Sequence, residues 1–243
     1  MKRTLFYPLL MTTMIAGLSG CKEQDGVSLQ YEKYTLDNGL EVVLHEDHSD
    51  PTVSMAIAYH VGSSREKPGK TGFAHFFEHM LFQRSENLPR NAFFQKINEM
   101  GGTFNGWTAN DMTVYFESVP RNALEKILWM ESDRMGYFIN TVTEGGLKRE
   151  IDVVSNEKRQ YENAPYGLMS ELLDKNLFPE GHPYSWEVIG EIPDLRSATV
   201  EDVKEFYNKY YTPSNATLVI AGDFDKAQTK ELVQKYFGEI PAR

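Results

Sequence analysis

The sequence predicts an α+β domain in which an antiparallel-rich sheet is covered by helices on one side. Three observations predict it: β-rich runs gather in the first part of the chain, helical periodicity dominates the middle, and a late strand is followed by a last helix. The chain has 243 residues, of which 41% are hydrophobic, so it is long enough to bury a sizeable core.

The first expected strands form a hairpin. Residues 31–36 and 40–45 are separated by Asp37-Asn38-Gly39, a turn sequence that suits positive φ values. From Val53 to Tyr59, apolar residues alternate with small or polar ones, so the strand expected at 52–61 should bury one face. Further strands are expected at 103–108, 112–119 and 216–221.

The helices are expected from caps and periodicity. Thr71 is a candidate N-cap for a helix ending near Gln83, and Gly101-Gly102 would close a helix over 91–100. A helix from Thr143 to about Glu162 carries apolar residues at spacings of four and three. Other helices are expected at 120–138, 167–177, 199–210 and 226–237.

The charge of the chain excludes one class of partner. The formal net charge is −10, and the 25 basic residues are scattered without a long Lys/Arg run. Nothing in the sequence attracts a phosphate backbone, so no nucleic-acid partner is expected.

The N-terminal sequence predicts a secretory signal. Lys2 and Arg3 precede a largely apolar stretch at 5–18, and Leu18-Ser19-Gly20-Cys21 resembles a bacterial lipobox, whose cysteine is lipidated. We expect residues 1–20 to be a lipoprotein signal peptide and 21–30 a tether, with the mature protein lipid-anchored in the periplasm. Lys22 favours the outer membrane. The alternatives are an ordinary signal peptide and an uncleaved anchor. Cys21 is the only cysteine, so no internal disulfide can form.

One motif carries metal chemistry. His75, Glu78 and His79 are spaced i, i+3 and i+4, which places them in one stripe about 100° wide on a helix. Two imidazoles one turn apart can take two tetrahedral positions on a zinc ion, and the carboxylate between them can reach a water without filling a position. This His-x-x-Glu-His order is that of the inverted zinc peptidases.

A catalytic zinc normally has a third protein ligand. Glu150 and Glu157 are seven residues apart, a difference of only about −20° in helical phase, so they share one helix face. From spacing alone, either could reach the metal.

The sequence resembles the pitrilysin/insulinase family of zinc metallopeptidases, which includes the mitochondrial processing peptidases, over essentially all of residues 31–240. Residues 72–82 resemble the metal helix of the family, and 150–157 resemble its E-x6-E helix. Residues 102–108 and 113–115 resemble the strand pair that lines the substrate cleft. His182-Pro183-Tyr184 and Ile189-Gly190 match a further family segment.

The resemblance implies a role for each motif residue. It makes Glu157 the third ligand of one Zn²⁺, Glu78 the catalytic base and Glu150 a supporting carboxylate. It places Asn105 on a strand along which an extended peptide substrate lies, although Asn105 could also be an ordinary strand-edge residue. One position departs from the pattern, since residue 106 is Gly where relatives commonly carry Ala.

The resemblance also implies an activity and a partner. We expect residues 31–243 to be the metal-bearing N-terminal half of a zinc endopeptidase that cleaves unfolded or short polypeptides. Family enzymes close this half against a second homologous domain, and this sequence ends about where the linker to that domain would begin, so we expect a second domain or subunit to be required. The alternative is a non-catalytic zinc-binding or scaffold subunit of a heteromeric peptidase.

Overall fold

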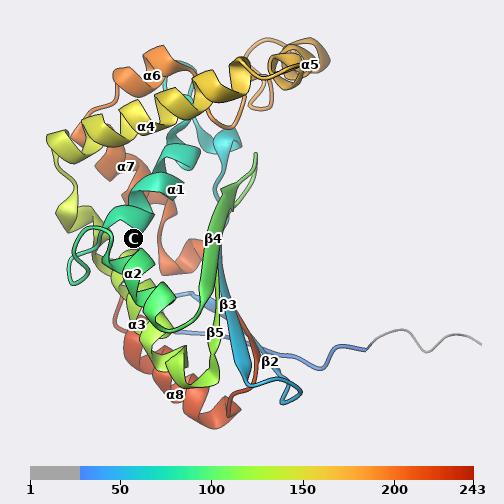
Figure 1. The fold of residues 1–243 in the computed structure, drawn as a ribbon, viewed down its shortest axis with the longest axis vertical. Helices are drawn as coiled ribbons and strands as arrows, with labels where there is room; N and C mark the ends of the chain where they lie inside the picture. The colour runs from blue at the N-terminus through green and yellow to red at the C-terminus, as the bar shows by residue number, and fades with distance from the viewer. Residues whose placement is uncertain (1–27) are drawn as a thin grey trace, which may run out of the picture. The chain divides into compact units, whose positions relative to one another are not determined.

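A computed structural model describes residues 28–243, and the predicted signal peptide and Cys21 lie outside the described residues. Residues 31–243 form one compact unit, in which helices pack on a six-stranded sheet (Figure 1). The predicted α+β class is therefore confirmed. The strands are β1 (Glu32–Thr35), β2 (Glu41–Glu46), β3 (Thr52–Tyr59), β4 (Thr103–Thr108), β5 (Thr113–Pro120) and β6 (Ala216–Gly222).

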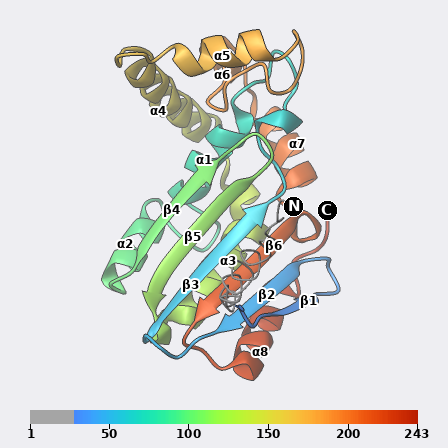
Figure 2. The ribbon, with the colours of Figure 1, turned by 90° about the vertical axis from the view of Figure 1, so that its right-hand side faces the viewer.

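The sheet is mixed, with the strand order β1-β2-β6-β3-β5-β4 (Figure 2). Every neighbouring pair is antiparallel except β2 and β6, which run parallel with Val42 opposite Leu218. The late strand β6 thus enters the middle of the sheet between two early strands. β4 lies at one edge of the sheet, with one side free of any strand partner among the described residues.

The helices gather on one face of the sheet (Figure 1). The alternation expected for the third strand is observed, because Val53, Met55, Ile57 and Tyr59 are all buried. The core therefore lies between this face and the helices. The helices are α1 (Phe73–Gln83), α2 (Ala92–Glu99), α3 (Leu124–Tyr137), α4 (Glu144–Glu162), α5 (Met169–Leu177), α6 (Ile192–Arg196), α7 (Val200–Tyr210) and α8 (Lys226–Phe237).

Of the three helix starts predicted at threonines, those at Thr143 and Thr199 agree with the structure and that at Thr71 does not. Thr143 caps α4 by accepting a hydrogen bond from the N–H of Gly146, and Thr199 caps α7 within a capping box. Thr71 does not cap α1: the residue at that position is Gly72, which has a φ of 87°. The short helix α6 was not expected. Within the described residues, no helix is long and apolar enough to cross a membrane.

Candidate metal centre

The start of α1 is fixed from outside the helix. Both oxygens of the buried Glu66 carboxylate accept backbone hydrogen bonds, one from Gly72 N–H and one from Ala74 N–H, each at 2.8 Å. These are donors that a helix N-terminus otherwise leaves unsatisfied. Burial raises the pKa of Glu66 to about 8, although the two N–H donors act in the opposite direction. Glu66 thus takes the place of the cap that Thr71 was expected to provide.

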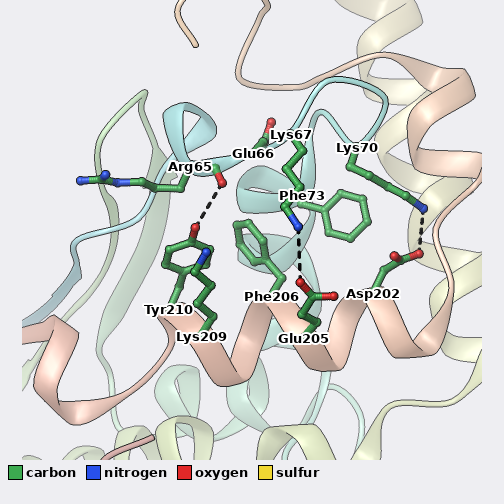
Figure 3. Close-up of a pocket in the computed structure, with 10 residues that line it drawn as sticks. All are labelled: Arg65, Glu66, Lys67, Lys70, Phe73, Asp202, Glu205, Phe206, Lys209 and Tyr210. Carbon is green, nitrogen blue, oxygen red and sulfur yellow. Dashed lines mark hydrogen bonds and ion pairs between the residues drawn. The ribbon is translucent and has the colours of Figure 1, made fainter.

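The loop that carries Glu66 is held against α7. Figure 3 shows a small pocket between them, with a volume of about 60 Å³, in which Phe73 and Phe206 lie side by side. Lys70 pairs with Asp202 at 2.8 Å across this junction. None of the residues of the metal motif lines the pocket, so it belongs to the support of α1 and not to the candidate site.

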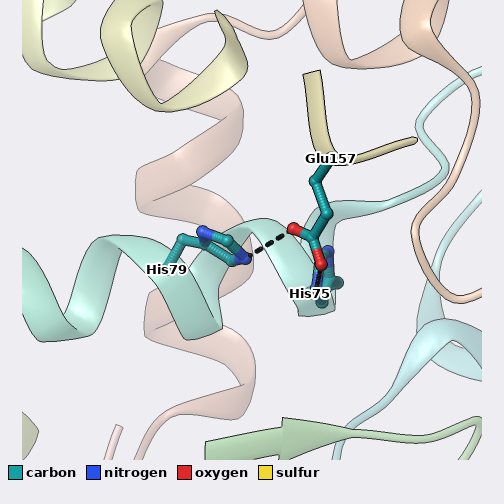
Figure 4. Close-up of side chains that lie close together, drawn as sticks. All are labelled: His75, His79 and Glu157. Atoms are coloured by element: carbon teal, nitrogen blue, oxygen red, sulfur yellow. Dashed lines mark ion pairs between the residues drawn. The ribbon is translucent and has the colours of Figure 1, made fainter. Parts of the chain in front are cut away.

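α1 presents its two histidines to a glutamate of α4. His79 Nε2 lies 3.1 Å from Glu157 Oε2, and His75 Nε2 lies 3.9 Å from Glu157 Oε1 (Figure 4). The three ligand atoms lie within 4.8 Å of one another, and in the described part of the chain no other His, Cys, Asp and Glu side chains form such a group.

These three side chains fit a zinc ion. With zinc–ligand bonds of about 2.0–2.1 Å, two ligands at tetrahedral positions lie about 3.4 Å apart. The two distances from Glu157 to the imidazoles, 3.1 and 3.9 Å, bracket this value. His75 Nδ1 is buried and has no hydrogen-bond partner within the described region. A zinc ion held by these three side chains, the candidate group that the described residues provide, would keep one coordination position for water, as catalytic zinc sites do.

In the metal-free protein, the pKa values of the two imidazoles are shifted in opposite directions. Burial lowers the pKa of His75 to about 4, and the neighbouring His79 adds to this effect. Burial would also lower the pKa of His79, but the hydrogen bond and charge of Glu157 outweigh it, so that pKa is raised. The same hydrogen bond lowers the pKa of Glu157. At neutral pH, His75 is therefore neutral and has a free lone pair for a metal.

Glu78 lies beside this group on the same helix. Its Oε2 accepts a hydrogen bond of 2.7 Å from the hydroxyl of Thr108 on β4. Burial raises the pKa of Glu78, while the Thr108 hydrogen bond acts against that rise. A partly buried carboxylate next to the candidate metal ligands, but outside their group, is placed to exchange protons.

Glu150 is not brought to the histidine nitrogens. It shares the face of α4 with Glu157, as the spacing predicted, but lies two turns earlier. The side chain is buried, and its Oε2 has no hydrogen-bond partner among the described residues. Burial raises its pKa, and the positive charge of His79 partly offsets the effect. Of the two glutamates that the spacing left open, Glu157 is the one that meets both imidazoles.

Asn105 lies on the other face of β4 from Glu78. Gly106 and Thr108 point toward α1, so strand alternation turns Asn105 to the opposite face, where it is exposed. Its Oδ1 accepts the N–H of Gly106 at 2.9 Å. Sequence reasoning missed Thr108 and Glu66. The period of two along 104–108 was the available signal for Thr108, whereas no local pattern identifies Glu66.

The fold and this site define a class, the inverted zinc peptidases. The chain belongs to the insulinase family of that class: residues 41–184 match the family model described as insulinase (Peptidase family M16). Residues 197–243 match the model of the Peptidase M16 inactive domain.

Individual relatives agree with this assignment. The zinc protease PqqE of Helicobacter pylori is 30% identical over 95% of this chain and 52% of its own length. The crystal structure of a protease from Helicobacter pylori superposes with a TM-score of 0.84 at 32% identity, over 88% of this chain and 51% of that one. The crystal structure of the periplasmic protease PqqL from Escherichia coli superposes with a TM-score of 0.80 at 25% identity, over 89% of this chain and 25% of that one. This chain spans about half the length of PqqE.

Proposed function

We propose that this chain is the metal-bearing part of a zinc-dependent endopeptidase that hydrolyses peptide bonds in unfolded or short polypeptides. The observation that carries the proposal is the meeting of His75, His79 and Glu157, with Glu78 beside them on the same helix face. Membership of a family whose relatives include zinc proteases supports it.

In this proposal His75, His79 and Glu157 hold the zinc. When bound, zinc supplies Lewis acidity, which lowers the pKa of a water toward about 7 and polarises the scissile carbonyl. Glu78 takes a proton from the attacking water and then delivers it to the leaving amine. Glu150 acts as a supporting carboxylate, and the influence of its charge on His79 is consistent with that role.

The substrate is proposed to lie along the free edge of β4. An extended peptide can add to an exposed sheet edge through main-chain hydrogen bonds, which give affinity with little sequence preference. β4 runs past Glu78, since its Thr108 hydroxyl contacts that carboxylate. Asn105 is proposed to contact substrate on this strand, from the face that points away from α1.

A second homologous domain or subunit is proposed to complete the enzyme. The length of the relatives supports this, because the chain covers 52% of one relative and 51% of another. The competing proposal is a non-catalytic zinc-binding or scaffold subunit. Retention of Glu78 favours the enzyme, since zinc binding alone needs only the three ligands.

The test compares wild type with Glu78→Gln, with and without a candidate second-domain partner. We expect one zinc per chain in both proteins, and peptide hydrolysis that falls about 10²–10⁴-fold in Glu78→Gln. Glu99→Gln is the matched control, because Glu99 is an exposed glutamate on α2. If both proteins bind zinc but no hydrolysis depends on Glu78, with or without the partner, the enzyme proposal is wrong and the scaffold proposal is favoured.

We also propose the N-terminal organisation that the sequence predicts: a signal peptide over 1–20, lipidation of Cys21 and a tether over 21–30, followed by the peptidase domain over 31–243. The lipobox-like residues support it, as does the description of the relative PqqL as periplasmic. The protein would then be anchored in the periplasm at the outer membrane. Palmitate labelling that persists in Cys21→Ala would contradict the lipid anchor.

A further inference from the structure

β4 is a wall of the candidate site as well as an edge strand. Its residues Phe104, Gly106 and Thr108 face α1, and Phe104 packs on Phe82 of α1 with ring centroids 5.6 Å apart. The position of the strand relative to α1 is therefore fixed by packing near Glu78. Any group of β4 that contacts Glu78 is therefore held in a defined position relative to α1.

Two residues of β4, Thr108 and Gly106, lie against the Glu78 carboxylate. The Thr108 hydroxyl donates to Glu78 Oε2 at 2.7 Å. The other oxygen, Oε1, lies over Gly106, where an added Cβ would stand 3.2 Å from it and 3.3 Å from Glu78 Cγ. One oxygen is thus tethered to the strand, and the missing side chain at 106 leaves room for the other.

We propose that Thr108 is a positioning residue for Glu78: its hydroxyl holds Oε2 against β4 and so fixes the carboxylate in the position from which it takes a proton from the attacking water. The inference rests on the proposed peptidase function. A glutamate side chain has several rotatable bonds, so without a tether its carboxylate samples positions from which proton transfer is not aligned. A misplacement of about 1 Å in a reacting group can lower a rate about 100-fold.

The proposal predicts separate behaviour for two substitutions at one position. Thr108→Val keeps the shape but removes the donor, whereas Thr108→Ser keeps the donor and removes a methyl group. We expect kcat to fall about 10–100-fold in Thr108→Val with little change in KM, and to stay within about 3-fold of wild type in Thr108→Ser. Zinc content should be unchanged in both.

Gly106→Ala provides a graded second perturbation. The added methyl group would meet Phe82 Cε2 at 3.0 Å and Glu78 Oε1 at 3.2 Å, so the carboxylate must shift by a few tenths of an ångström. We expect a loss of kcat smaller than that of Thr108→Val. Thr35→Val is the control, because Thr35 is exposed on β1, at the edge of the sheet opposite β4.

The experiment measures steady-state kinetics of the zinc-loaded full chain with its partner, and crystal structures of the wild type and both Thr108 variants. In the structures, we expect the Glu78 carboxylate to leave its position in Thr108→Val and to keep it in Thr108→Ser. An unmoved carboxylate in Thr108→Val would overturn the inference, as would an equal loss of kcat in both variants. If Glu78→Gln inactivates the enzyme but Thr108→Val keeps the wild-type kcat, only this inference fails. If Glu78→Gln retains hydrolysis, the proposed function fails.

Discussion

Glu66→Ala is expected to destabilise the protein by loosening the start of the metal helix. The substitution removes the acceptor of two backbone hydrogen bonds, from Gly72 N–H and Ala74 N–H. Leaving a buried donor unsatisfied costs about 1–3 kcal/mol, and water that enters the space left by the side chain recovers part of that cost. We therefore expect the free energy of unfolding to fall by about 2–4 kcal/mol.

The measurement is equilibrium urea unfolding of the metal-free protein. Glu205→Gln serves as the control, since Glu205 is an exposed glutamate that pairs with Lys67 of the same loop at 3.5 Å. An exposed ion pair contributes about 0–1 kcal/mol, so this variant should unfold close to wild type. Because His75 lies in the first turn of α1, Glu66→Ala should also bind zinc more weakly. Stability of Glu66→Ala within about 0.5 kcal/mol of wild type would refute the capping role.

Three further predictions concern the same helices. In the metal-free protein, NMR titration of the imidazole C–H signals should give His75 a pKa below 6.5, near 4, and His79 a raised one. The folded-state pKa of His75 is depressed, so its contribution to stability is present above pH 6.5 and is lost as the pH falls toward 4. The folded-state pKa of His79 is raised, so its contribution is present below pH 6.5 and is lost as the pH rises through that raised pKa. Glu157→Gln should lower the pKa of His79 in the same titration and reduce zinc affinity, measured by competition with a chelator. Gly72→Ala should lower the melting temperature, because Gly72 has a φ of 87° and an added Cβ would lie 2.6 Å from Ile189 O; an unchanged melting temperature would contradict this reading.

The sequence predicted those parts of the site that lie close together along the chain. His75, Glu78 and His79 share one helix face because of the 3.6-residue period, and the spacing of Glu150 and Glu157 limited the third ligand to two candidates. The structure brings Glu157 to the imidazoles, a contact between α1 and α4 that spacing could not predict.

Long-range contacts account for what the sequence did not predict. Thr71 has the residue type of an N-cap, yet its hydroxyl donates to Asp194 at 2.7 Å, and a glutamate six residues before Gly72 does the capping. The parallel pairing of β2 with β6 was also not predicted. Local alternation determines which face of a strand is buried but not which strand lies beside it.

One short segment, residues 187–190, contacts both helices of the candidate metal centre, α1 and α4. Gly190 lies so close to Gly72 that a Cβ at residue 190 would collide with the Gly72 backbone, and the φ of Gly190 is 73°. On the side of α4, Glu187 pairs at 3.2 Å with Lys158, the buried neighbour of Glu157. The segment that contains Ile189-Gly190 therefore contacts α1 just before His75 and α4 just after Glu157. A side chain at 190 would displace one helix relative to the other, and with it the spacing of the three ligand atoms, without touching any of them.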